Sequence, residues 1–143
     1  MITRDDVVRE ARQLVGAEWV HQGRDPATGI DCLGVVICVA NKLGIPFSDR
    51  TDYGREPVGM LLVDEIRERL VEIPVSEIQY GDILILRTPG KELPTHVAFL
   101  AKGDYELTLI HSIQMAKSRK TVEEPYRRWQ RFVTHAFKFK EID

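Results

Sequence analysis

The stretch Asp31-Cys32-Leu33-Gly34-Val35-Val36-Ile37-Cys38-Val39-Ala40 is apolar at nearly every position after its first residue. A helix that is apolar on all sides lies at the centre of a fold rather than on its surface. Asp31 is a favourable N-cap residue, and the segment 43–46, Leu-Gly-Ile-Pro, carries a glycine and a proline that end helices. The sequence therefore predicts a central helix from Asp31 or Cys32 to about Lys42.

Two amphipathic helices are expected on either side of this segment, separated from it by polar loops. Thr3 is a candidate N-cap for the first, and Gly16 is a plausible end. Residues 17–30 are rich in Gly, Pro, Asp and Thr and are interpreted as a loop. The apolar positions at helical spacing are Val7, Val8, Ala11, Leu14 and Val15 in the first helix, and Leu61, Leu62, Ile66 and Leu70 in the other, which follows Pro57.

The second half of the chain has the pattern of strands. A turn at residues 80–82 precedes an apolar run at 83–86, and further strands are expected at about 95–101, 106–113 and 134–140, with a short helix near 125–131. Helices first and strands second indicate an α+β fold, with N-terminal helices packed on an antiparallel β-sheet. The 143 residues contain no repeat or flexible linker and predict one domain, 1–143.

Charge and composition narrow the possible partners. With 20 basic and 22 acidic side chains, the formal net charge is -2, which gives no reason to expect nucleic acid as a partner. No apolar run is long enough for a membrane span. The first ten residues are charged and lack the apolar core of a secretory signal, so the chain is expected to be cytoplasmic as synthesised.

Cys32 is the most informative of the possible reactive groups. At the start of a helix, the helix dipole and free backbone N–H groups stabilise a thiolate, so a lowered pKa is expected for a partly exposed thiol. The same N–H groups could hold an oxyanion, and Gly34 would keep side-chain bulk away from the thiol. Cys38 is interpreted as a small core residue, because this is the commonest place for a buried cysteine.

A thiolate nucleophile also needs a base and a group that orients the base. A two-residue turn at Gly103-Asp104 would place His96 directly opposite His111, on the strand face that should pack against the central helix. Single histidines on strands are more often structural, and the residues alone only slightly favour catalysis. A metal site at Cys32, His96 and His111 lacks a fourth ligand, so no metal or cofactor is expected.

Three short motifs resemble the signatures of the NlpC family of papain-like cysteine peptidases, which act in bacterial and phage cell-wall metabolism. They are Gly29-Ile30-Asp31-Cys32-Leu33-Gly34, Thr95-His96-Val97-Ala98 and Ile110-His111-Ser112. Residues 80–84 and 124–127 also resemble the family, so the similarity covers nearly the whole chain. The resemblance implies a papain-like NlpC-type fold, and hydrolysis of an amide bond in the peptidoglycan stem peptide, with D-γ-glutamyl–diamino acid as the expected bond.

The resemblance also implies roles for individual residues. Cys32 would be the nucleophile, His96 its base and His111 the orienting group. Trp19 stands where family members commonly have a tyrosine, so the substrate pocket or oxyanion hole is expected to differ. The candidate residues for these functions are Trp19, His21, Gln22 and Asp31, although Trp19 could equally be a loop anchor.

Leu33 after the cysteine, and the absence of a signal, favour a phage tail-associated branch of the family. Tail proteins would then be partners, and the virion tail or the cell wall the place of action. An inactive wall-binding or tail-assembly module of the same fold is the main alternative, and an acyl transferase or intracellular amidase is another. Arg24, Asp25, Asp52, Tyr53 and Arg55 could contact a charged stem peptide, although a solvated surface is the preferred interpretation for them.

Overall fold

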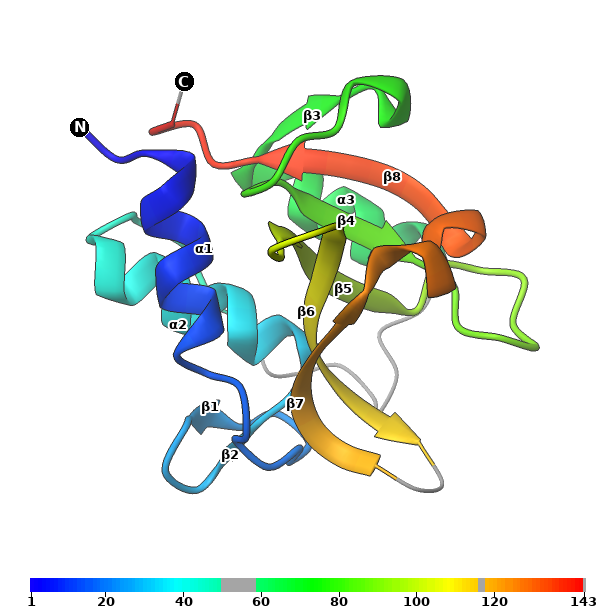
Figure 1. Cartoon of the computed structure of the whole chain (residues 1–143), viewed down its shortest axis with the longest axis horizontal. Coiled ribbons are helices and arrows are strands. Elements are labelled where there is room, and N and C mark those ends of the chain that lie inside the picture. The colour runs from blue at the N-terminus through cyan, green and yellow to red at the C-terminus, as the bar shows by residue number, and fades with distance from the viewer. Residues whose placement is uncertain (50–58, 116–117, 143) are drawn as a thin grey trace.

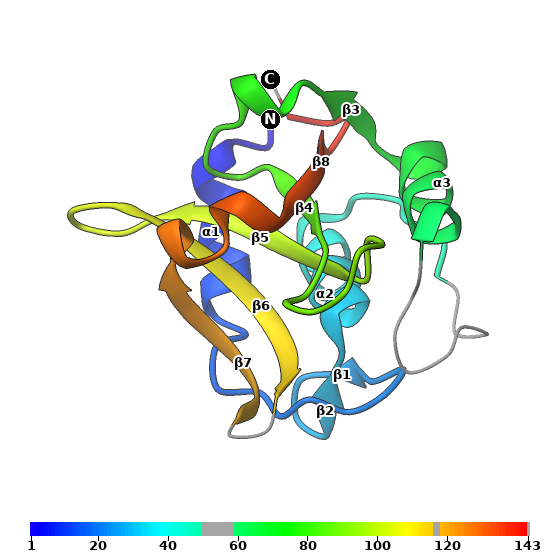
Figure 2. The same ribbon diagram turned by 90° about the vertical axis from the view of Figure 1, so that its right-hand side faces the viewer.

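The computed structural model describes residues 1–49, 59–115 and 118–142. Its main feature is a six-stranded sheet in the order β3-β8-β4-β5-β6-β7, with every neighbouring pair antiparallel. Figures 1 and 2 show the sheet with the helices α1 and α2 beside it, which confirms the predicted α+β class. The strands are β3 (Val71–Ile73), β4 (Ile83–Leu86), β5 (His96–Lys102), β6 (Leu107–Met115), β7 (Ser118–Pro125) and β8 (Val133–Lys138).

Helices α1 (Arg4–Arg12) and α2 (Cys32–Leu43) begin at the predicted caps. Thr3 and Asp6 form a reciprocal capping box, which satisfies two backbone N–H groups at the start of α1. Val15 was expected in the buried stripe of this helix, but α1 ends at Arg12 and Val15 is 43% exposed. Gly44 ends α2 with a φ of 70°, a left-handed conformation that glycine adopts without strain.

Helix α3 (Gly59–Arg69) stands apart from α1 and α2 in Figure 2. Its buried face carries Leu62, Val63 and Ile66, and Leu70 follows directly after it, also buried. The side chain of Leu61, which was expected on the same face, lies outside the described residues. The predicted amphipathic helix is thus present. No helix among the residues that the structure describes is long and apolar enough to cross a membrane.

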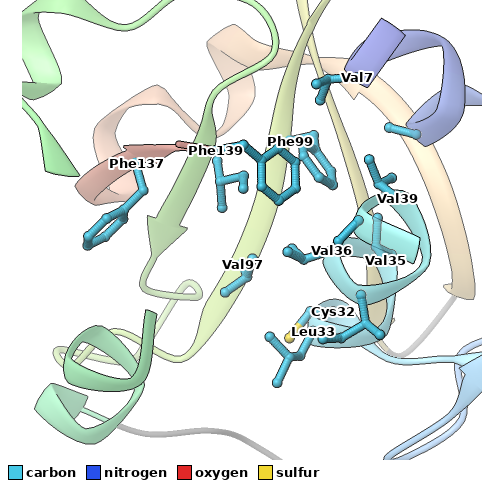
Figure 3. Close-up of a cluster of buried hydrophobic side chains, with 14 of the residues drawn as sticks. Val7, Cys32, Leu33, Val35, Val36, Val39, Val97, Phe99, Phe137 and Phe139 are labelled. Carbon is cyan, nitrogen blue, oxygen red and sulfur yellow. The ribbon is translucent and has the colours of Figure 1, made fainter. Parts of the chain in front are cut away.

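The sheet has a hydrophobic cluster on each face, because side chains alternate along a strand. Figure 3 shows the first cluster, where Val97 and Phe99 of β5 pack with the residues of α2. Alternate residues of the same strand, Ala98 and Leu100, belong to the second cluster, which Trp129 and Phe132 cover. Both faces of the central strands are therefore buried, and β4 reads as a continuous apolar run for this reason.

Several elements were not predicted from the sequence. The loop 17–30 contains a small hairpin of β1 (Arg24–Asp25) and β2 (Gly29–Ile30), and β3 and β7 are additional strands of the main sheet. The short helix expected near 125–131 is a pair of 3-10 turns, η2 (Tyr126–Arg128) and η3 (Gln130–Phe132), and a further 3-10 turn, η1 (Val75–Glu77), follows β3. Strand β7 was missed because it is an edge strand rich in charged residues, which is typical of protected sheet edges.

Candidate active site

The candidate site is built on the N-terminus of α2, where Asp31 joins the helix to the preceding loop. The Asp31 carboxylate accepts hydrogen bonds from the backbone N–H of Gly34 at 2.8 Å and of Gln22 at 3.0 Å. The Arg24 guanidinium lies 2.9 Å from the same carboxylate, whose side chain is 5% exposed. A buried carboxylate with this set of partners is fully compensated, so it holds loop 17–30 in a defined position against the start of α2.

Cys32 is the first residue of α2, and its thiol lies against the start of β5 (Figure 3). The residue is only 6% exposed, and burial raises the pKa of its thiol to about 12. The negative charge of Asp31 raises the pKa further, and the backbone N–H groups of Val97 and Leu33 lower it without cancelling the effect of burial. The expectation of a partly exposed thiol with a lowered pKa was therefore wrong, because desolvation outweighs the helix N-terminus.

This environment predicts slow alkylation of Cys32 by iodoacetamide at neutral pH, since the thiolate is the reacting form. With a pKa of about 12 against about 8.5 for an unstructured cysteine, the thiolate fraction at pH 7 is lower by roughly a thousandfold or more. The rate should keep rising with pH above 9. Alkylation would be followed by mass spectrometry in Cys38→Ala protein, with Cys32→Ala as control. A rate that levels off below pH 8.5 would contradict this prediction and indicate a thiolate–imidazolium pair.

His96 and His111 are brought into direct contact, but not by the predicted register. The pairs Phe99↔Ile110 and Lys102↔Leu107 show a four-residue connection at 103–106, closed by a bond from the Gly103 N–H to the Glu106 carbonyl oxygen. This register is shifted by two residues, so the two histidines are diagonal neighbours rather than directly opposite. An even shift keeps both on one face, and diagonal aromatic side chains still reach each other. The His96 Nε2 to His111 Nδ1 distance is 2.6 Å.

The face that carries the two histidines was also predicted wrongly. Val97 and Phe99 face α2, so His96 and His111 lie on the opposite side, with the second cluster. The Trp129 ring covers them, with centroid distances of 6.1 Å to His96 and 5.1 Å to His111. Burial, followed by the nearby His111, lowers the pKa of His96 well below its ordinary value. His96 is therefore neutral, as a base that accepts a proton must be.

Glu124 of β7 is a further member of this arrangement, which sequence reasoning did not assign to the site. Its carboxylate oxygen lies 2.8 Å from His111 Nε2, so His111 is bonded at both ring nitrogens. The hydrogen bond from His111 lowers the pKa of Glu124, and one from the Trp129 side chain adds to this effect. The available signal was the pair Glu123-Glu124 before Pro125, but only recognition of β7 as the strand next to His111 would have pointed to it.

The other predicted site residues lie in the loop before α2. Trp19 is buried, its backbone N–H donates to the Arg119 carbonyl at 2.8 Å, and the Arg119 guanidinium lies 5.8 Å from its ring centroid. This is the loop-anchor arrangement. The His21 ring stacks on Trp19 at 6.5 Å, and Gln22 has a left-handed φ of 58°, held by its bond to Asp31. Their roles toward a substrate stay predictions.

Three further assignments concern possible specificity residues and the second cysteine. Arg24 is bound to Asp31 and Asp49, so its charge is used within the protein rather than directed at solvent. Asp25 accepts a hydrogen bond from the Ala27 N–H in the turn between β1 and β2. Cys38 is buried, and its thiol donates to the Arg24 carbonyl at 3.3 Å. Asp52, Tyr53 and Arg55 lie outside the described residues.

Comparison with protein families gives a match to the NlpC/P60 family model over residues 16–137. The chain belongs to the NlpC/P60 family. The matched region contains Cys32, His96, His111 and Glu124, and leaves out residues 1–15 and 138–143. The sequence resemblance to this family is therefore confirmed, while the assignment to a phage tail branch stays a prediction. No curated protein matches the chain.

Several solved structures have the same fold as this chain. The NlpC/p60 domain of the peptidoglycan hydrolase SagA matches with a TM-score of 0.67 and 22% identity, over 96% of this chain and 100% of that domain. An NLP/P60-family protein from Staphylococcus aureus, described as similar to lipoprotein, matches with a TM-score of 0.63 and 22% identity, over 95% of this chain and 41% of its own. Ly7917 matches with a TM-score of 0.57 and 16% identity, over 96% of this chain and 63% of its own.

Proposed function

We propose that this NlpC/P60 protein is a cysteine peptidase that hydrolyses an amide bond in peptidoglycan stem peptides, with the bond from D-γ-glutamate to the diamino acid as the expected target. The observation that carries the proposal is the 2.6 Å contact of His96 with His111. His96 directly precedes Val97, whose backbone N–H hydrogen-bonds to the Cys32 thiol. The family assignment supports peptidoglycan as the substrate.

The proposed reaction starts with Cys32 as a neutral thiol and His96 as a neutral imidazole. His96 uses Nε2 in its contact with His111, so Nδ1 is the nitrogen left to accept the Cys32 proton. As the proton moves to Nδ1, the sulfur attacks the amide carbonyl carbon and the carbonyl electrons move to oxygen. The carbon–nitrogen bond then breaks, and the leaving amine takes the proton from His96. Water, deprotonated by His96, then attacks the thioester carbonyl carbon. The carbon–sulfur bond breaks, the acid is released, and the proton on His96 returns to the Cys32 sulfur.

Stabilisation of the oxyanion is assigned to groups at the start of α2. The helix N-terminus presents backbone N–H groups there, and its dipole favours negative charge. Asp31 is proposed to act through the loop, because it fixes the backbone of Gln22 next to this N-terminus. Trp19 and His21 would form the adjoining wall of the substrate pocket, with an indole N–H where many relatives have a tyrosine hydroxyl.

Incubation with defined stem peptides tests the proposal. We expect a tripeptide or tetrapeptide stem to be cleaved after D-γ-glutamate, with the two fragments identified by mass spectrometry. Cys32→Ala should abolish cleavage, and Cys38→Ala should leave it unchanged, so the two cysteines of the same helix form a matched pair. If wild type leaves every stem peptide intact, or Cys32→Ala cleaves as well as wild type, the proposal is wrong.

A non-catalytic wall-binding or tail-assembly module of the same fold is the second candidate. One observation favours it: the Cys32 residue is only 6% exposed, and its pKa is raised to about 12. In that case, sedimentation with purified cell walls or assembly into tails should be the same for wild type and Cys32→Ala. Measuring cleavage and binding on the same two proteins separates the candidates.

Association with a phage tail is proposed on the strength of Leu33 after the nucleophile. The protein would then be made in the cytoplasm and reach the wall as part of the particle. Mass spectrometry of purified particles against the soluble fraction of the producing cell is the test. Detection in the soluble fraction, with none in particles, would contradict the proposal.

A further inference from the structure

We propose that Glu124 is a positioning residue that fixes the proton arrangement of the two histidines, so that His96 presents an unprotonated Nδ1 to Cys32. This inference rests on the proposed hydrolytic function and adds to it a fourth group, one that touches neither thiol nor substrate. It is carried by the continuous chain of contacts from His96 through His111 to Glu124.

The proton arrangement follows from what each group can donate. A carboxylate only accepts hydrogen bonds, so the 2.8 Å contact with Glu124 places a proton on His111 Nε2. With a single proton on its ring, His111 would have a bare Nδ1, which would accept from the Nε2–H of His96 over 2.6 Å. Neutral His96 consequently has a bare Nδ1. One carboxylate at the end of the chain thus determines the tautomer of both rings.

Burial makes the proton positions on the two histidines depend on Glu124. His111 is completely buried, and His96 is 4% exposed, so solvent does not reach either ring while Glu124 is in place. Without Glu124, His111 can place its proton on Nδ1 and turn the contact around. His96 would then accept at Nε2 and hold its own proton on Nδ1, where it blocks proton transfer from Cys32. The negative charge also favours the positive charge that the histidines gain during attack.

The surroundings hold the Glu124 side chain at this position. Glu124 lies next to the 3-10 turn that begins at Tyr126, and Trp129 on the following turn hydrogen-bonds to its carboxylate. The same Trp129 ring packs on both histidines. The preceding residue, Glu123, points to the other face of β7, where it binds Arg12 at 2.8 Å and the Thr108 hydroxyl at 2.6 Å. Glu123 is therefore a matched control with its own ion pair.

The test compares Glu124→Ala, Glu124→Gln and Glu123→Gln in two measurements. The first is kcat/KM for the stem peptide cleaved by wild type. The second is the tautomer of His96, read from the nitrogen chemical shifts of the imidazole by NMR. We expect Glu124→Ala to lower kcat/KM about 100-fold through kcat, and to move the His96 proton to Nδ1 in a substantial part of the molecules. Glu123→Gln should change neither.

Glu124→Gln separates hydrogen bonding from charge, because its amide oxygen still accepts from His111. We expect it to keep the wild-type tautomer and to lose about 10-fold in kcat/KM. A wild-type tautomer in Glu124→Ala, or equal rates for Glu124→Gln and Glu123→Gln, would overturn the proposal. If Glu124→Ala does not fold, the rates of the two Gln variants decide. If wild type cleaves no stem peptide, the proposed function fails, while the tautomer measurement still decides the role of Glu124.

Discussion

Replacing His96 by alanine is expected to lower kcat/KM by at least about 10⁴-fold, the loss that removal of a catalytic base from a nucleophile–base pair produces. The thiol of Cys32 is neutral, because its pKa is raised to about 12, so attack cannot rely on a thiolate present beforehand. The proton must leave as the sulfur attacks, and we propose that His96 accepts it, since the backbone of the next residue, Val97, hydrogen-bonds to the Cys32 thiol. The loss should therefore appear in kcat, measured with the stem peptide at saturating concentration.

His135→Ala is the control for this prediction. His135 lies on β8, where its Nδ1 contacts the Thr134 hydroxyl at 2.9 Å, away from the two buried histidines. We expect its kcat to stay within about twofold of wild type, because His135 is half-buried on another strand and has no role in the proposed reaction. Thermal unfolding should show that both variants fold. More than a tenth of wild-type activity in His96→Ala would show that another group takes the Cys32 proton.

The central helix was predictable because its signals are local. An apolar run bounded by an N-cap aspartate and a following glycine predicts both ends of α2, and the structure has them at Cys32 and Leu43. The histidine pair depends on the connection between β5 and β6, where Gly103-Asp104 resembles a two-residue turn. The actual connection spans 103–106, so the register differs from the predicted one by two residues. Both histidines still lie on one face because the shift is even.

Properties that depend on distant parts of the chain could not be predicted in the same way. The pKa of Cys32 is set mainly by burial, and burial depends on how β5 and loop 17–30 close around the helix start. Glu124 comes next to His111 through pairing of β6 with β7, and the charged residues of β7 conceal a strand. The capping pattern predicted a reactive thiolate at Cys32. Burial of the residue by packing keeps its thiol protonated instead.

Gly34 shows how the same helix start depends on close backbone contact. It was expected to leave room beside the thiol, but its Cα faces the loop. A Cβ there would lie 2.4 Å from the Gly23 carbonyl oxygen and 3.1 Å from Ile30 Cβ. Gly34→Ala is therefore expected to destabilise the protein by about 3 kcal/mol, as overpacking does, where an ordinary helical Gly→Ala change stabilises by about 1 kcal/mol. Urea unfolding measures the difference.

The clash has a consequence for activity because the loop cannot move independently of the site. Gly23 follows Gln22, whose N–H is bound to the carboxylate that caps α2, so displacement of the loop also disturbs Asp31 beside Cys32. A misplacement of about 1 Å is expected to lower kcat/KM about 100-fold. Gly44→Ala, at the other end of α2, has nothing within 4 Å of the added Cβ and only the strain of a φ of 70°. It should lose about 1 kcal/mol and keep full activity. If Gly34→Ala is as stable as wild type, the loop can withdraw from α2 at little cost in folding free energy. Loss of activity in this stable variant would then show that the substitution acts on the geometry of the site.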